Sequence, residues 1–256
     1  MKLLKIILSA VLLFTVLSCK NEKNNNELAT NSSDKIVENE LKVIPITHGT
    51  LVLESKSEVI YIDPTGGAEA FNGQKPPTLV LITDIHGDHL STSTLEALNL
   101  TNVTVIGPKA VTDKIPSIVS KNIVTLNNDE KLDYNDVNIE AIPMYNLREE
   151  ALKFHTKGRG NGYVLTINNE RIYISGDTED IPEMRNLKAI DKAFVCMNLP
   201  YTMPVKSAAD AVLDFKPKTV YPYHYRGTDG LSDVNLFKKI VNDGNKSIEV
   251  KLLDWY

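Results

Sequence analysis

From about Leu41 onward, short runs of apolar and often β-branched residues alternate with polar turns, a pattern typical of a strand-rich fold. The first three runs, at residues 43–46, 50–55 and 58–63, predict consecutive strands of a meander. Residues 78–83 are almost continuously apolar, as in a strand that is buried on both faces. Residues 91–100 then predict a helix with Ser91 or Ser93 as its cap.

The second half of the chain has the same kind of pattern, and the sequence contains no internal repeat longer than a strand pair. Further strands are predicted at residues 103–107, 122–126, 137–143, 162–167, 171–175, 194–197 and 219–221. Helices are predicted at residues 110–120, 207–215 and 233–241. The arrangement predicts an α+β fold in which two β-sheets pack face to face with helices on their outer faces.

The N-terminus has a different pattern. Lys2 and Lys5 precede an apolar run at residues 6–17, which is shorter than the roughly 20 residues of a bilayer-spanning helix and fits a signal peptide. The run ends in Ser18 and Cys19 and resembles a bacterial lipobox, which implies cleavage before Cys19 and a diacylglycerol on its sulfur. An ordinary secretory signal with an incidental cysteine is the alternative.

The lipobox divides the chain into three parts. Residues 1–18 would be the lipoprotein signal peptide, residues 19–40 a polar and flexible tether, and residues 41–256 the folded domain. We therefore expect a protein of the bacterial cell envelope, anchored to a membrane through Cys19 and facing the periplasm or the exterior.

Composition narrows the classes of partner. The chain has 256 residues, of which 42% are hydrophobic and 24% charged, as in soluble globular domains. The net charge of -5 and the lack of a long basic block make nucleic acid an improbable partner, whereas a homo-oligomer is compatible with the sequence. Two cysteines exclude a disulfide scaffold and a cysteine-rich zinc site, and Cys196 lies in an apolar run that indicates a buried structural thiol.

Five histidines carry the functional signal. The segment from Asp84 to His89, Asp-Ile-His-Gly-Asp-His, places four metal-ligand side chains in six residues between a predicted strand and a predicted helix. A solvated loop that caps the helix is the alternative. His155, Asp177 and His224 each lie where a predicted strand runs into a loop, and together the residues supply enough donors for two adjacent metal ions.

This set resembles the metallo-β-lactamase superfamily, whose signature is His-x-His-x-Asp-His followed by a later His, Asp and His. The resemblance covers residues 41–256 and is closest to the branch of metal-dependent hydrolases similar to ascorbate-6-phosphate lactonase. It implies an αββα sandwich with the metal ions at one edge between the sheets. The implied metal ligands are Asp84, His86, Asp88, His89, His155, Asp177 and His224.

The resemblance also implies how the ligands are shared. One ion would take Asp84, His86 and His155, the other Asp88, His89 and His224, and Asp177 would bridge them. Zinc, with two ions, is the expected cofactor. Asp84 stands where the signature has histidine, and a carboxylate there makes the site harder, which favours Mn or Fe or weakens that position.

Two adjacent ions would hold a hydroxide at neutral pH and polarise the electrophile, so the sequence predicts a hydrolase acting on an ester, lactone or phosphodiester bond of a small substrate. We expect His86, Asp88 and His224 to be catalytic. A phosphodiesterase acting on nucleotides or lipid headgroups is one alternative. A metal-bearing binding lipoprotein without catalysis is another.

Other polar residues could contact the substrate. Lys157, Arg159 and Arg226 lie beside predicted ligands and could attract an anionic substrate, although exposed loop cations are common. Tyr225, like Tyr201 and Tyr223, could line the pocket or pack in the core. His48 follows the first predicted strand and is either a rim or substrate group or a plain surface histidine.

Overall fold

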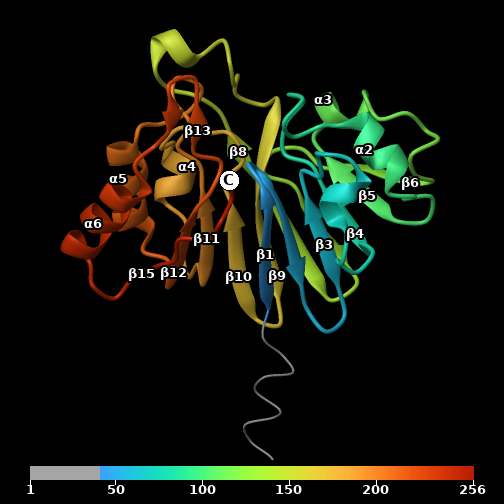
Figure 1. Cartoon of the computed structure of the whole chain (residues 1–256), viewed down its shortest axis with the longest axis horizontal. Helices are drawn as coiled ribbons and strands as arrows, with labels where there is room; N and C mark the ends of the chain where they lie inside the picture. Colours follow the sequence, from blue (N-terminus) through green and yellow to red (C-terminus); the bar gives the residue numbers. More distant parts are fainter. Residues whose placement is uncertain (1–40) are drawn as a thin grey trace, which may run out of the picture. The chain divides into compact units, whose positions relative to one another are not determined.

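The first six strands form one mixed sheet in chain order (Figure 1). In the computed structural model, which describes residues 41–256, the first three strands pair antiparallel and the next three join in parallel. The predicted signal peptide, Cys19 and tether lie outside the described residues. The strands are β1 (Lys42–Thr47), β2 (Thr50–Glu54), β3 (Val59–Ile62), β4 (Leu79–Leu81), β5 (Thr104–Gly107) and β6 (Asn122–Thr125).

The second sheet has the order β15-β12-β11-β10-β9-β8-β7. Its strands are β7 (Lys131–Tyr134), β8 (Val137–Met144), β9 (Gly160–Ile167), β10 (Glu170–Ile174), β11 (Lys192–Val195), β12 (Thr219–Pro222) and β15 (Glu249–Val250). Strands β7 to β10 pair antiparallel, and β10, β11, β12 and β15 pair in parallel. A short hairpin joins β13 (Arg226–Gly227) to β14 (Gly230–Leu231).

Helices cover the outer faces of the two sheets. Helices α5 and α6 flank the second sheet, and α2 and α3 lie beside the first (Figure 1). The helices are α2 (Thr92–Ala97), α3 (Lys109–Thr112), α4 (Pro182–Arg185), α5 (Val205–Phe215) and α6 (Val234–Gly244), with 3-10 turns η1 (Ala68–Phe71) and η2 (Glu149–Ala151). Within residues 41–256, no helix combines the length and the apolar character that a bilayer span requires.

Alternating side chains of the first sheet supply two layers of core. On β2, Leu51 and Leu53 join the cluster between the sheets, which also contains Tyr163 and Ile172 of the second sheet. Val52, between them in sequence, joins a separate cluster beneath the helices. Burial on both faces explains the nearly continuous apolar runs of these strands. The two mixed sheets with outer helices that the sequence predicts are therefore confirmed.

One predicted element is wrong in extent. The helix expected at residues 110–120 is only α3, which ends at Thr112. Pro116 lacks the amide hydrogen that a continued helix needs, and its ring would clash with the preceding turn. The pattern also missed the edge strand β7 and the short elements α4, β13, β14 and β15.

Candidate metal centre

The loop between β4 and α2 carries four of the predicted ligands. The amides of His89 and Leu90 both donate to the carbonyl of His86, at 3.0 and 2.8 Å, and fold the loop into a tight turn. Ser91 then caps α2 by accepting a hydrogen bond from the Thr94 amide, as predicted. The turn places Asp84 and His89 in the interior, both fully buried.

The three later ligands come from the second sheet and reach the same place. His155 lies between β8 and β9, Asp177 follows β10, and His224 follows β12. All three are buried, with at most 3% of their surface exposed. Backbone approaches closely here, because a Cβ on Gly49 would lie 2.7 Å from Cδ2 of His224. Position 49 therefore has no room for a side chain.

One group of donors, which we call the Asp84 cluster, consists of Asp84, His86 and His155. Oδ2 of Asp84 lies 2.6 Å from Nδ1 of His86 and 3.8 Å from Nε2 of His155. The two imidazole rings meet edge to face with their centroids 5.1 Å apart. These are the three residues that the family resemblance assigns to one ion.

A second group, the His89 cluster, consists of His89, Asp177 and His224. Nε2 of His89 lies 3.1 Å from Nε2 of His224 and 3.5 Å from Oδ2 of Asp177. Asp177 also reaches the Asp84 cluster, because its Oδ2 is 3.4 Å from Nε2 of His155. One carboxylate thus lies between the two clusters, the position that the resemblance gives to a bridging ligand.

Asp88 and His48 flank the His89 cluster. Oδ2 of Asp88 lies 3.4 Å from Nε2 of His224 and 3.3 Å from Nε2 of His48. These three residues form a further potential cation site. His48 Nδ1 contacts the hydroxyl of Tyr256 at 2.7 Å. His48 is therefore partly buried beside the centre. The sequence had left two interpretations of His48 open, a group at the rim of the site and a plain surface histidine.

The donor set fits a metal ion. Nε2 of His155 and Oδ1 of Asp177 are buried and have no hydrogen-bond partner among the described residues. Such atoms are costly unless something satisfies them. The centre brings imidazole nitrogens and carboxylate oxygens together in the combination that divalent zinc, manganese and iron accept. A cation in each cluster would satisfy these atoms.

Burial and neighbouring charges act in opposite directions on the pKa values of the centre. Burial alone would raise the pKa of Asp177, but His224, His89 and His155 outweigh it and hold the pKa well below its usual range. Burial would lower the pKa of His89, yet the carboxylates of Asp177 and Asp63 raise it well above its ordinary value. Burial lowers the pKa of His155 and favours its neutral, ligating form.

Sequence reasoning missed the groups that orient two of the ligands. Oδ2 of Asp63, directly after β3, accepts a hydrogen bond from Nδ1 of His89 at 2.8 Å, which turns Nε2 toward the centre. The carbonyl of Tyr201 accepts one from Nδ1 of His155 at 3.1 Å, and the Asn146 amide lies 3.2 Å from the same nitrogen. Asp63 shares with Asp84 and Asp177 a place just past a strand, the one signal that could have identified it.

The predicted substrate residues lie in varied surroundings. Arg159 donates to both carboxylate oxygens of Asp84, at 3.2 and 3.0 Å. Lys157 pairs with Glu183 at 2.8 Å and lies over the Tyr145 ring. Arg226 stacks on the Tyr256 ring, which also packs edge to face with the buried Tyr225.

The centre opens into a pocket of about 320 Å³. Its lining residues are His86, Asp88, Phe154, His155, Asp177, Asn198 and Tyr201. Tyr223, by contrast, is fully buried, and its hydroxyl accepts a hydrogen bond from the Gly176 amide. Tyr201 is therefore the tyrosine that borders the pocket, while Tyr223 packs in the core.

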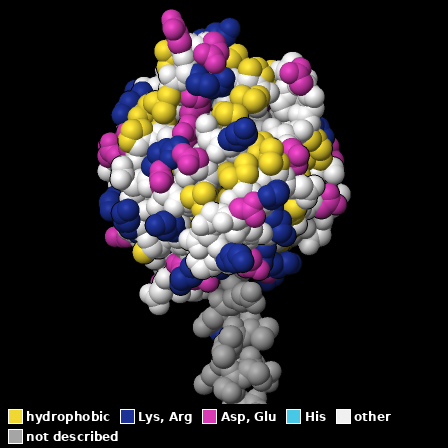
Figure 2. All heavy atoms as spheres, turned by 90° about the vertical axis from the view of Figure 1, so that its left-hand side faces the viewer, with side chains coloured by type: hydrophobic (Ala, Val, Ile, Leu, Met, Phe, Trp, Pro, Cys, Tyr) yellow, Lys and Arg dark blue, Asp and Glu magenta, His cyan; other side chains and the backbone are white. Residues whose placement is uncertain are grey.

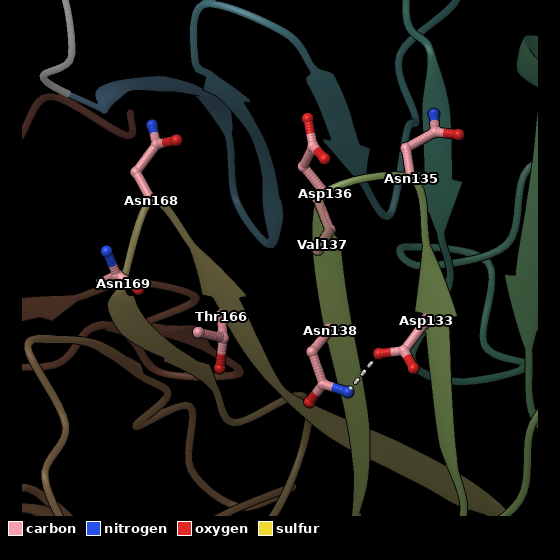
Figure 3. A pocket seen from close by; sticks show the side chains of 8 residues that line it. All are labelled: Asp133, Asn135, Asp136, Val137, Asn138, Thr166, Asn168 and Asn169. Atoms are coloured by element: carbon pink, nitrogen blue, oxygen red, sulfur yellow. Dashed lines mark hydrogen bonds between the residues drawn. The ribbon is translucent and has the colours of Figure 1, made fainter.

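A second hollow of about 390 Å³ lies at the turns of the second sheet, between β7 and β8 and between β9 and β10 (Figure 3). Its carboxylates do not converge, since Asp133 is tied to Asn138 at 2.7 Å and Asp136 points elsewhere (Figure 3). Figure 3 shows the side chains of Asn168 and Asn169 on the opposite side of the hollow. Its lining has no histidine, whereas His86 and His155 line the first pocket.

Comparison with known proteins agrees with this geometry. Residues 42–224, which include all seven predicted ligands, match the β-lactamase superfamily domain. A UPF0173 metal-dependent hydrolase of Thermococcus onnurineus is 31% identical over 207 residues, which cover 76% of this chain and 90% of that protein.

Two crystal structures show the same fold. A protein from Parabacteroides distasonis, described as a metal-dependent hydrolase, has 35% identity and a TM-score of 0.75 over 84% of this chain and 94% of its own. The metallo-β-lactamase fold protein YhfI of Bacillus subtilis has 12% identity and a TM-score of 0.66, over 84% and 96%, a likeness of fold alone. The predicted αββα sandwich is confirmed.

Proposed function

Because the chain belongs to the β-lactamase superfamily and, within it, to the UPF0173 metal-dependent hydrolases, we propose that it hydrolyses a small substrate at the centre described above. The bond cleaved is an ester, lactone or phosphodiester bond. The observation that carries the proposal is that both donor clusters converge on one open pocket, with buried atoms of His155 and Asp177 that have no hydrogen bond among the described residues.

Each of the two ions would have its own set of ligands. Asp84, His86 and His155 would hold one ion. Asp88, His89 and His224 would hold the other, with Asp177 between the two ions. A bound ion of this kind would acidify a water molecule and polarise the carbonyl or phosphoryl oxygen of the substrate. Zinc suits the imidazoles, and the carboxylate of Asp84 makes Mn or Fe acceptable at the first position.

Residues of this chain would orient the reaction. Asp88 borders the pocket with 42% of its side chain exposed, and its carboxylate would accept the proton of an attacking water. The hydroxyl of Tyr201 accepts a hydrogen bond from Thr228 at 3.1 Å, so its own hydrogen remains available for a developing oxyanion. His86, 40% exposed, faces the same space.

The rim of the pocket favours a substrate with an apolar part. Phe154 and Tyr201 meet edge to face at 5.0 Å in the pocket wall. Exposed apolar side chains lie on the loops that carry these residues and on the adjoining hairpin: Leu147, Leu152, Leu199 and Leu231. Figure 2 shows hydrophobic side chains more frequent in the upper half of the face it views, the end where β13 lies in Figure 1. Two of the predicted substrate cations, Lys157 and Arg159, are already paired with carboxylates.

Turnover and metal content test this function. Protein purified without chelators should contain metal and cleave nitrophenyl esters, with longer acyl chains preferred to acetate, while a lactone and bis-nitrophenyl phosphate report the other bond types. His86→Ala and His224→Ala should each remove most of the turnover, and Asp133→Asn, in the second hollow, should not. Metal without turnover on any of these substrates would point to the non-catalytic binding role, and absence of metal would refute the assignment.

We also propose that Cys19 anchors the protein to a membrane of the cell envelope, with the domain facing the periplasm or the exterior. The support is the signal-like run that ends at this cysteine. Several acyl chains hold a protein firmly, so Cys19→Ala should release it to the soluble fraction. Retention of the processed variant in membranes would contradict the proposal.

A further inference from the structure

Arg159 occupies an unusual place in the centre. It lies directly before β9, and its guanidinium reaches the carboxylate of Asp84, which follows β4 in the other sheet. Nε is 3.2 Å from Oδ1 and Nη2 is 3.0 Å from Oδ2, so both oxygens accept from the same group. Nη2 also donates to the carbonyl of Phe154 at 2.6 Å, which fixes the guanidinium in place.

This pairing competes with a cation for the same oxygens. Oδ2 of Asp84, the oxygen nearest His86 and His155, is one of the two that Arg159 engages. Two-point guanidinium–carboxylate pairs are strong and geometrically specific. The guanidinium is permanently charged and has no lone pair to offer a metal, so it can repel an ion here but cannot bind one.

The His89 cluster has the opposite support. Behind His89 stands the carboxylate of Asp63, an acceptor, which leaves Nε2 of the imidazole free for a ligand. Behind Asp84 stands a cation, which withdraws electron density from the ligand and adds a positive charge beside the ion. We therefore expect the two clusters to differ in affinity.

We propose that Arg159 sets this difference: by holding Asp84, it makes the Asp84 cluster the weaker and readily exchanged metal position, while the His89 cluster retains its ion. The inference rests on the proposed function only in that both clusters bind metal. Loading of the first position then requires Asp84 to share or leave its guanidinium partner.

A matched control is close by in the chain. Lys157 is also a cation of this loop, but its side chain is 60% exposed, against 19% for Arg159, and it pairs with Glu183. Lys157→Gln removes the same unit of charge without touching Asp84. Any effect confined to Arg159 therefore reports the contact with Asp84 and not the charge of the loop.

The experiment measures zinc binding by the full chain. The experiment compares wild-type protein with Arg159→Gln, Arg159→Lys and Lys157→Gln. Each protein is dialysed to equilibrium against buffered zinc, and the number of zinc ions per chain is measured by elemental mass spectrometry. Wild type should bind one ion tightly and a second more weakly. Arg159→Gln should bind the second about 10- to 100-fold more tightly, the range that charge-assisted hydrogen bonds are worth, with the first unchanged.

The remaining variants keep the test decisive. Lys157→Gln should match wild type, and Arg159→Lys, which keeps the charge but loses the two-point contact, should fall between wild type and Arg159→Gln; it also serves if Arg159→Gln does not fold. Weaker or unchanged second-ion binding in the Arg159 variants overturns the inference, since Arg159 would then orient Asp84 as a ligand or play no part. Absence of any tightly bound ion in wild type would instead refute the proposed function, and this inference with it.

Discussion

The two clusters of the metal centre use similar ligands but receive opposite support. In the His89 cluster, the buried ligand donates to the carboxylate of Asp63, which strengthens it as a ligand. In the Asp84 cluster, Asp84 accepts hydrogen bonds from the guanidinium of Arg159, which we propose weakens it as a ligand. The comparison predicts that the group behind a ligand, and not the ligand type alone, sets its affinity for metal.

Exposure distinguishes His86 from the other histidines of the two clusters. His89 and His224 are fully buried, whereas His86 borders the pocket with 40% of its side chain exposed. Asp177, which lies between the clusters, and Asp88, 42% exposed beside the His89 cluster, border the same pocket. An ion in either cluster would therefore be reached from this pocket.

The largest effect should come from the residue that the clusters share. Asp177→Asn should lower metal affinity at both positions by more than about 100-fold, beyond the range of groups that only orient a ligand, and abolish turnover. The reason is that Asp177 lies within 3.5 Å of donors in both clusters. Metal content after dialysis is the measurement, and loss of only one ion would show that Asp177 belongs to a single cluster.

A smaller effect, confined to the ion of the His89 cluster, is expected when Asp63, the residue that orients His89, is changed. Asp63→Asn keeps the shape but removes the charge behind Nδ1, and should cost about 10- to 100-fold in affinity for the tightly held ion. Competition with a chromogenic chelator measures this loss. If the weaker ion were the one affected, the assignment of strong and weak positions would be reversed.

Replacing Asp84 by histidine should change which metal the Asp84 cluster prefers more than it changes how many ions bind. Asp84→His restores an imidazole, which suits zinc, in place of a carboxylate, which suits manganese. After equilibration in a mixture of both metals, the bound zinc-to-manganese ratio should rise relative to wild type. An unchanged ratio, together with unchanged stoichiometry in Asp84→Ala, would remove Asp84 from the set of ligands.

The smallest effect on metal should come from Tyr256→Phe. The hydroxyl accepts from the amides of Tyr225 and Arg226 and contacts His48, so its loss should cost about 1 kcal/mol of stability. Urea denaturation measures the free energy of unfolding. Metal affinity should hardly change. If Tyr256→Phe lowered metal affinity as much as Asp63→Asn does, metal binding would depend on His48.

Much of the fold could be predicted because a buried strand has a recognisable local pattern of apolar residues. The runs that became β2, β3 and β4 are apolar on both faces, so their assignment needed no knowledge of their partners. The edge strand β7, half of whose residues are exposed, carries no such signal. The helix at residues 110–120 failed because apolar spacing outweighed Pro116.

The candidate ligands could be proposed from the sequence for a similar reason, whereas the groups that support them could not. Four of the candidates lie within six residues, and the motif is specific. Arg159 and Asp84 are 75 residues apart, and Asp63 and His89 are 26 apart. Only the packing of the sheets brings these partners together, so no local pattern reveals that one candidate ligand is backed by a carboxylate and another by a guanidinium.

The origin of the ligands in different sheets has a mechanical consequence. Asp84 and His89 follow a strand of the first sheet, whereas Asp177 and His224 follow strands of the second. An ion bound among them would cross-link the sheets at one edge of their interface. Chelation should therefore do more than stop catalysis: amide hydrogen exchange should accelerate at the ends of β4, β10 and β12, where the two sheets would no longer be tied together.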